Sequence, residues 1–101
     1  MTTPDKQARR YTVRGRVQGV GFRWFVESEA HQLKIAGWVR NTSDGAVELL
    51  AIGTPAQLSA LKAKLRQGPR AARVDEVEER PAEVSQETAA GSTTFRIEGT
   101  W

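Results

Sequence analysis

The nine residues 15–23, which read GRVQGVGFR, place two glycines and an arginine where a predicted strand turns into a predicted helix. Apolar and polar residues alternate before the loop, and helical spacing of apolar residues begins at Phe22. Gly19 and Gly21 can take backbone angles that a side chain would forbid, so amide N–H groups can point at a common centre beside the positive end of the helix. Arg23 adds a formal charge. The loop therefore predicts a binding site for a phosphate or a carboxylate.

Arg23 strengthens this interpretation, although the loop matches neither of two widespread phosphate-binding motifs. The sequence contains no GxxxxGK, and Trp24 stands where the dinucleotide-binding fingerprint needs its third glycine. Glycines before a helix more often allow a tight turn or close packing than bind a ligand. A cation in the first helical turn, however, lies at the positive end of the helix dipole, which is unfavourable unless an anion neutralises both. A guanidinium there can form two parallel hydrogen bonds to a phosphoryl group.

The period of the apolar residues predicts the remaining elements. After the loop these are a helix over 22–33, strands over 35–41 and 46–52, a helix from 55 to about 68, and strands over 73–80 and 94–99. Imperfect alternation within 73–80 indicates a bulge or an edge strand, and the polar stretch 81–92 is expected to be a loop. Up to residue 80 the predicted order is βαββαβ, which favours an α+β fold in which an antiparallel sheet carries both helices on one face.

The face of the sheet without helices is expected to carry a mixture of charges and one aromatic ring. Its predicted members are Arg14, Arg16, Trp38, Arg40, Glu48, Arg96 and Glu98. Arginines stacked on Trp38 are one interpretation, and a solvated charged face is the one that we favour. Trp24 and Trp38 are expected to pack or to lie on the sheet face rather than to stack on bases.

Length and composition point to one small domain. At 101 residues the chain can bury a single modest core, and we expect one domain over 9–101 after a flexible polar leader over 1–8. The sequence shows no signal peptide and no apolar run of membrane-spanning length, so a cytoplasmic location is expected. The protein is also expected to be a monomer. The absence of cysteine excludes disulfides and zinc sites of the thiolate kind, and a single histidine leaves few designs for a metal site. No cofactor is expected. A net charge of +3 would attract anions in general.

Asn41, at the end of the strand that leads into the predicted hairpin, is the second candidate functional residue. Asparagine in a turn commonly bonds to its own backbone. Asp44 and Gly45 already account for the turn, which leaves the Asn41 amide available to hold a water molecule in a fixed orientation. Ser28 and His31 fall away from the apolar stripe of the first helix without an obvious acidic partner, and are expected at the surface.

Two stretches resemble the signature sequences of acylphosphatases, small enzymes with a ferredoxin-like βαββαβ sandwich. They read GRVQGVGFRWF over 15–25 and GWVRNTSDGAVE over 37–48, and the agreement in spacing and element order extends over 9–101. The resemblance implies hydrolysis of acyl phosphates to a carboxylate and phosphate without a metal. It also implies that Arg23 and the loop amides bind the substrate phosphate and that Asn41 positions the attacking water. The loop residues so implied are Val17, Gln18, Gly19, Val20, Gly21 and Phe22.

The sparse set of candidate residues is consistent with that chemistry. An ordinary phosphate ester expels a poor alkoxide leaving group, which needs help from an acid or a metal. An acyl phosphate expels a carboxylate, whose conjugate acid has a pKa of about 4, so no protonation is needed. Charge stabilisation and alignment of water then remain, and Arg23, the loop amides and Asn41 suit these tasks. Inorganic phosphate and other anions are expected to bind as product or inhibitors.

Two alternatives remain open at this point. A basic chain with the order βαββαβ could be a nucleic-acid-binding module, but 46–52 lacks the aromatic residues on which such domains stack bases, so nucleic acid is an unlikely partner. Acylphosphatase-like domains also occur within larger carbamoyl-transferring maturation proteins. The length of this chain favours a free-standing enzyme instead.

Overall fold

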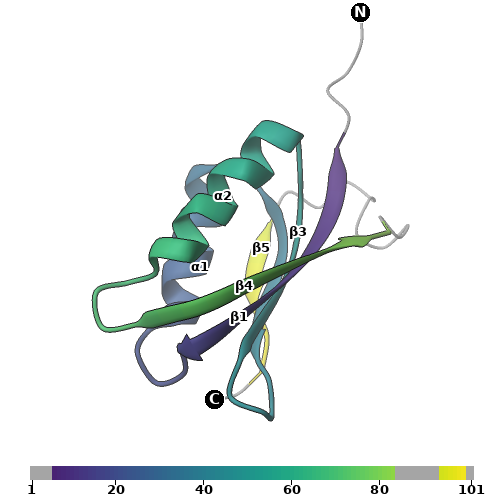
Figure 1. Ribbon diagram of the computed structural model, residues 1–101. Helices are drawn as coiled ribbons and strands as arrows, with labels where there is room; N and C mark the ends of the chain where they lie inside the picture. Colours follow the sequence, from purple (N-terminus) through teal and green to yellow (C-terminus); the bar gives the residue numbers. More distant parts are fainter. Residues whose placement is uncertain (1–5, 84–93, 100–101) are drawn as a thin grey trace, which may run out of the picture.

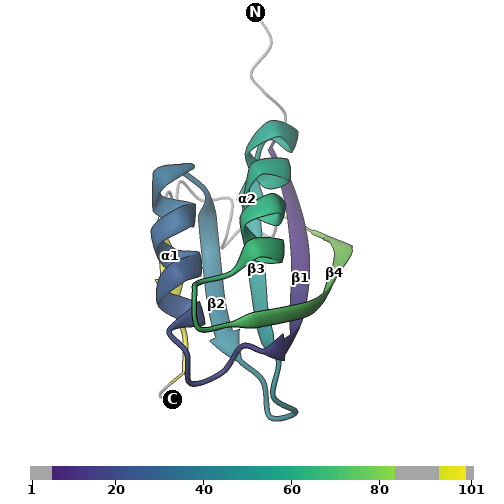
Figure 2. The same ribbon diagram turned by 60° about the vertical axis from the view of Figure 1, so that its left-hand side comes forward.

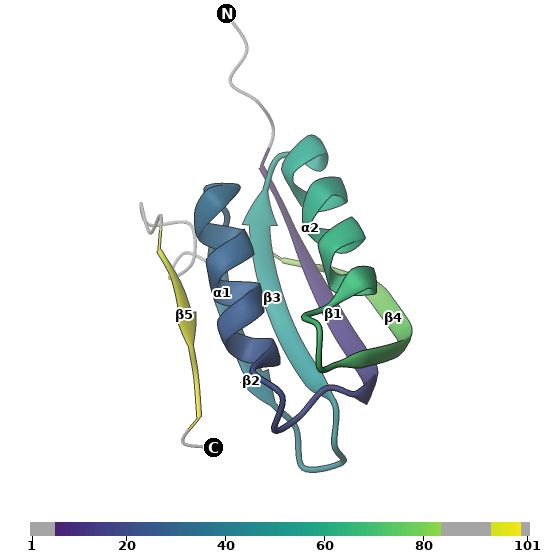
Figure 3. The same ribbon diagram turned by 90° about the vertical axis from the view of Figure 1, so that its left-hand side faces the viewer.

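A computed structural model describes residues 6–83 and 94–99 and shows two helices on one face of a five-stranded sheet (Figures 1 and 3). Its elements are β1 (Gln7–Arg16), α1 (Phe22–Gln32), β2 (Ala36–Asn41), β3 (Val47–Gly53), α2 (Pro55–Gln67), β4 (Arg73–Ala82) and β5 (Phe95–Ile97). The strands lie in the order β4-β1-β3-β2-β5. The predicted βαββαβ order is therefore confirmed for the first six elements, and β5 corresponds to the strand predicted over 94–99. Within the described residues, no helix is long and apolar enough to cross a membrane.

The expectation of an antiparallel sheet is correct for four strands and wrong for the fifth. β1 pairs antiparallel with β3 and β4, and β2 pairs antiparallel with β3, whereas β5 pairs parallel with β2. The backbone N–H of Glu98 donates to the carbonyl of Val39 at 2.8 Å, which fixes the end of β5 beside β2. Alternation of side chains has the same period in parallel and antiparallel strands, so it carries no information on direction.

Two predicted boundaries also differ from the structure. β1 begins at Gln7, so the expected leader is shorter by its last two residues, and residues 1–5 lie outside the described part. β4 continues through Pro81 to Ala82, where the sequence predicts a loop, and residues 84–93 are not described. Proline is tolerated there because β4 is an edge strand. The predicted irregularity is confirmed, since the register between β1 and β4 shifts between Arg14 and Gly15.

The helices bury the faces that the spacing of their apolar residues predicts. α1 buries Phe22, Val26 and Ala30, and α2 buries Leu58, Leu61 and Leu65. Strand residues that face the helices complete this core, namely Tyr11, Val13, Val39, Val47, Leu49, Ala51 and Phe95. α2 begins with a reciprocal pair of hydrogen bonds, in which the Thr54 hydroxyl accepts from the Gln57 backbone and the Gln57 side chain accepts from the Thr54 backbone.

The open face of the sheet carries both arginines stacked on Trp38 and paired surface charges, the two interpretations that the sequence left open. The guanidinium groups of Arg10 and Arg40 lie 5.4 and 4.7 Å from the ring centroid of Trp38, and both arginines pair with Glu48. Arg14 pairs with Asp44 and Glu78, and Arg96 pairs with Glu98. The sequence did not predict a second apolar cluster on this face, formed by Ala8, Ala36, Leu50 and Ile52.

Glu79 of β4 gathers three polar side chains between α2 and the sheet. Lys62 Nζ donates to one of its carboxylate oxygens at 2.6 Å, and the Tyr11 hydroxyl donates to the other at 3.4 Å. Arg9 Nε lies 3.5 Å from the second oxygen. Burial, together with the Glu79 charge, raises the pKa of Tyr11 to about 12. The hydrogen bond from Lys62 is the main cause that lowers the pKa of Glu79.

The titration of Tyr11 tests this packing, because the sequence contains a single tyrosine. We expect a tyrosinate absorbance midpoint at about 12 in the folded protein, and a lower midpoint in Glu79→Gln. Because the folded pKa is raised, the neutral phenol stabilises the fold fully below pH ~10, and this contribution is lost as the pH rises towards 12. The free energy of unfolding of Tyr11→Phe should lack that pH dependence. A native midpoint close to that of free tyrosine would contradict the account.

Candidate active site

The loop between β1 and α1 and the hairpin between β2 and β3 lie at the same end of the sheet (Figures 1 and 2). β1 and β2 both pair antiparallel with β3, so they run in the same direction and their carboxyl ends meet at this end. Val47 of β3 is opposite Val13 of β1 on one side and opposite Asn41 of β2 on the other. The topology therefore brings the glycine loop and the strand end that carries Asn41 together.

Apolar side chains fix both ends of the loop in the core. Val17 and Phe22 are fully buried, and Val20 packs against the same cluster. Gly19 and Gly21, in contrast, are exposed and have φ angles of 74° and 77°. A Cβ atom on either glycine would meet no atom within 4 Å, so the backbone angle, not lack of space, is what requires glycine. The loop is thus anchored on one side and open on the other.

The amino terminus of α1 opens onto this loop without a cap. Gly21 is the N-cap residue and makes no side-chain hydrogen bond, and the first turn contains no acidic residue. Free N–H groups at the start of a helix attract anions. Arg23 lies half-buried in the first turn, and its guanidinium has no ion pair or side-chain hydrogen bond among residues 6–83 and 94–99. Among the described residues, nothing therefore compensates these two sources of positive charge, which lie at the same place.

The side chain of Gln18 ties the loop to the hairpin. Its amide nitrogen donates to the carbonyl oxygens of Thr42 and Ala46, each at 2.8 Å. Both carbonyls belong to the turn that follows Asn41. Because the side-chain NH2 group donates to two backbone carbonyls of the hairpin, it fixes the loop relative to the end of β2. Sequence reasoning predicted only a backbone role for Gln18 and missed this contact.

Hydrogen bonds from Thr42 shape the hairpin itself. The Thr42 hydroxyl accepts from the Ala46 backbone N–H at 3.0 Å and donates to the Asp44 carboxylate. Arg14 of β1 reaches the other oxygen of Asp44 at 3.1 Å. The hydrogen bond from Thr42, followed by the Arg14 contact, lowers the pKa of Asp44. Asp44 and Gly45 therefore form the predicted turn, and Asn41 remains half-buried at the end of β2 with a contact of its own.

The other candidates lie away from this arrangement. Ser28 and His31 are exposed, as predicted, although His31 Nε2 also lies 3.0 Å from the Phe95 carbonyl oxygen. The sequence predicts that Trp24 packs or lies on the sheet face, but its side chain is exposed. Trp38 does lie on the sheet face. Arg10 and Arg40 stack on its ring, which leaves less of the ring for a nucleic acid base.

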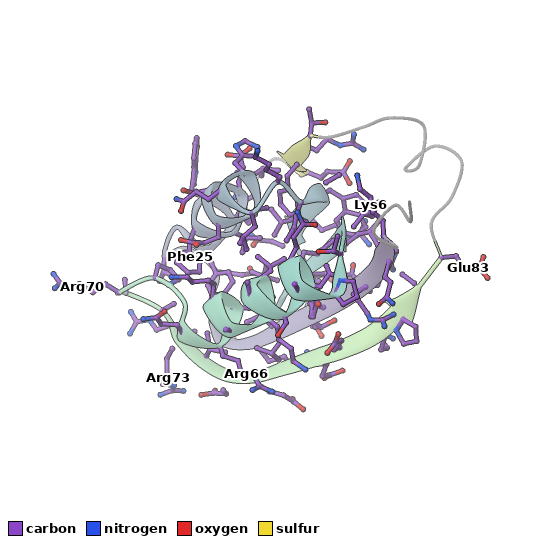
Figure 4. The ribbon with its side chains drawn as sticks, turned by 90° about the horizontal axis from the view of Figure 1, so that it is seen from above. Lys6, Phe25, Arg66, Arg70, Arg73 and Glu83 are labelled. Carbon is purple, nitrogen blue, oxygen red and sulfur yellow. The ribbon has the colours of Figure 1, made fainter. Side chains whose placement is uncertain are left out.

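The surroundings of the site are basic. Arg66, Arg70 and Arg73 project outward around the turn from α2 to β4 (Figure 4), which adds general attraction for anions at this end of the molecule. In the described part of the chain, no three His, Cys, Asp or Glu side chains are grouped as they would be around a metal ion. A pocket of about 270 Å³ lies beside the start of α2, at the opposite end of β1 from the loop.

A family model, a similar sequence and a similar structure all match this chain to acylphosphatases. The acylphosphatase family model matches residues 9–97. The chain is 58% identical over 99 residues to an acylphosphatase of Koribacter versatilis, covering 98% of this chain and 86% of that protein. Its structure is similar to an acylphosphatase from Coxiella burnetii, with a TM-score of 0.85 and 35% identity, over 97% of this chain and all of that one.

One larger protein of known structure also contains this fold. Full-length HypF, in a phosphate- and nucleotide-bound form, matches 97% of this chain with a TM-score of 0.81 and 28% identity. The match covers 12% of HypF, whereas it covers 86% of the protein from Koribacter versatilis. The identity is also lower than with the small acylphosphatases. On the family match and the sequence identity together, the chain belongs to the acylphosphatase family.

Proposed function

We propose that this protein hydrolyses small acyl phosphates to a carboxylate and inorganic phosphate, with Arg23 and the loop amides as the phosphate site and Asn41 as the residue that positions water. The observation that carries this proposal is the uncapped start of α1, with an arginine that pairs with no carboxylate in the described part of the chain, tied through Gln18 to the strand end that bears Asn41. The site requires a ligand with a concentrated negative charge, and the phosphoryl group of an acyl phosphate supplies it.

The loop and Arg23 act on the phosphoryl oxygens. In the proposed complex, backbone N–H groups of residues 17–22 and the guanidinium donate to these oxygens and stabilise the charge that they carry in the transition state. The helix dipole adds to this stabilisation. Because the loop is anchored by Val17, Val20 and Phe22, the donors are held in place before the substrate arrives. Little reorganisation is then needed during the reaction.

Asn41 supplies the remaining requirement, which is the position of the nucleophile. Its amide accepts a hydrogen bond from a water molecule and places the water oxygen in line with the bond to be broken. The oxygen–phosphorus bond to water forms, the bond from phosphorus to the acyl oxygen breaks, and the carboxylate leaves with the electron pair. No side-chain base is assigned, and a phosphoryl oxygen of the substrate accepts the proton of the water.

The choice of leaving group follows from the absence of an assigned acid. A carboxylate leaves without protonation, since its conjugate acid has a pKa of about 4. An alcohol or phenol is a poorer leaving group and would need a proton donor or a metal ion. We therefore propose a metal-independent reaction, with inorganic phosphate as product and as inhibitor, and a protein that acts as a monomer in the cytoplasm. A role in binding nucleic acid gains no support from Trp38, whose ring is stacked by two arginines.

The leaving-group argument is tested by comparing two substrates in the presence of a chelator. Acetyl phosphate should be hydrolysed at an unchanged rate after chelation, and phenyl phosphate should be hydrolysed at a rate lower by about 10² or more, because phenolate is the poorer leaving group. Phosphate release is the measurement. Cleavage of both substrates at similar rates, lost on chelation, would contradict the proposed chemistry.

The two residue roles are separated by kinetics of Arg23→Ala and Asn41→Ala. Each variant should lower the turnover number by about 10² or more, because each removes a group that acts in the transition state. Inhibition by inorganic phosphate should weaken in Arg23→Ala and persist in Asn41→Ala, since Asn41 does not hold the phosphoryl group.

Ser43→Ala is the matched control, because Ser43 is exposed in the same hairpin as Asn41. It should retain full activity. Circular dichroism should show that all three variants keep the fold. A purified Asn41→Ala protein with wild-type turnover would remove Asn41 from the mechanism.

A further inference from the structure

Trp24 is the large apolar side chain that stands exposed beside the proposed phosphate site, with an exposed fraction of 71%. Single exposed apolar residues are common on protein surfaces, so exposure by itself indicates little. The position of Trp24 is what makes it informative. It follows Arg23 directly in the first turn of α1, at the end of the helix that opens onto the glycine loop.

Helix geometry tilts the Cα–Cβ bond of Trp24 towards the end of α1 that adjoins the loop. The bond from Cα to Cβ tilts towards the amino terminus in every α-helix, so side chains of the first turn lean over the residues that precede the helix. For Trp24 those residues are the loop 17–21. Trp24 therefore starts from the end of α1 that adjoins the loop, within reach of the rim of the proposed site.

The face of α1 that carries Trp24 is separate from the one that packs on α2. Phe25 lies on the side of α1 that faces α2 (Figure 4), and its ring is 5.9 Å from that of Phe22 in the core. Seven residues are close to two full turns, so Trp24 shares its face with His31, which contacts the Phe95 carbonyl of β5. Trp24 lies on this β5 side near the start of α1, and its high exposure shows that β5 does not cover it.

The organic part of the substrate has to pass this rim. If the loop amides and Arg23 hold the phosphoryl oxygens, the acyl group extends outward from the loop, because the opposite side is closed by Val17, Val20 and Phe22. An indole ring offers a flat apolar surface that contacts aromatic groups well and a small methyl group poorly. Arg23 and Trp24, adjacent in sequence, would then divide the recognition of the charged and apolar ends.

We propose that Trp24 is a specificity-determining residue that binds the acyl group and favours aromatic over small aliphatic acyl phosphates. This inference rests on the proposed function and deepens it, since it names the class of acyl group. Trp24 acts only in binding. The phosphoryl group is still held by Arg23 and the loop amides, and the attacking water is still positioned by Asn41. The contact lies at the exposed edge of the site, so its loss should act mainly on KM.

The test compares benzoyl phosphate with acetyl phosphate in the wild-type chain and in Trp24→Ala. The variant should lose about 5- to 10-fold in kcat/KM for benzoyl phosphate, mainly through a higher KM, in line with the strength of one aromatic contact. For acetyl phosphate the loss should stay below about twofold. Trp24→Phe should recover most of the preference for benzoyl phosphate, because it restores an aromatic surface.

Gln32→Ala is the control, because Gln32 is exposed at the far end of α1. This variant should leave kcat/KM unchanged for both substrates. Thermal unfolding should show that Trp24→Ala keeps wild-type stability, as expected for an exposed side chain. A ratio of the two kcat/KM values that stays unchanged in Trp24→Ala would overturn the inference and leave the proposed function standing. Failure of the wild-type chain to hydrolyse either substrate would overturn the proposed function, and the inference with it.

Discussion

The two hydrogen bonds from the Gln18 side chain to the carbonyls of Thr42 and Ala46 join the halves of the proposed site. One half is the loop and the start of α1, with its surplus of positive charge. The other half is the end of β2, with the amide of Asn41. These halves come from segments that are adjacent in space only because β1 and β2 flank β3 in the same direction. The sheet determines their approximate positions, and Gln18 fixes the remaining freedom of the loop.

An anion site at a helix start depends on positive charge that no neighbouring acidic side chain compensates. Elsewhere in the described structure many arginines are paired with carboxylates, such as Arg14 with Asp44 and Glu78, and Arg40 with Glu48. At the start of α1 there is no cap side chain and no acid in the first turn. The missing compensation costs stability in the free protein and is recovered when an anion binds. We infer that binding and helix stability are therefore coupled at this end of the molecule.

Most of the fold could be predicted from the sequence because strong local patterns specify it. Alternation located the strands of the core, and the Thr54–Pro55 pair located the start of α2. The parallel pairing of β5 could not be predicted, since alternation is independent of strand direction. The pattern of 73–80 indicated a bulge or an edge strand, but only the assembled sheet shows that β4 lies at an edge, where Pro81 can continue the strand.

In the candidate site, too, local features could be predicted from the sequence and long-range contacts could not. Glycines with positive φ angles and an arginine in the first helical turn are local features, and the residue types alone indicate an anion site. The contact between Gln18 and the hairpin joins residues 24 and 28 positions apart in the sequence, and no local pattern encodes it. The exposure of Trp24 likewise depends on how α1 packs between α2 and β5.

The central claim is that the loop and the start of α1 form the anion site, and phosphate titration followed by heteronuclear NMR tests it most directly. We predict that inorganic phosphate shifts the backbone amide signals of residues 17–23 in a saturable way, and that Arg23→Ala raises the phosphate concentration needed for saturation. Shifts centred instead on Arg9 and Lys62 at the other end of the sheet, or no saturable shift at the loop, would contradict the account.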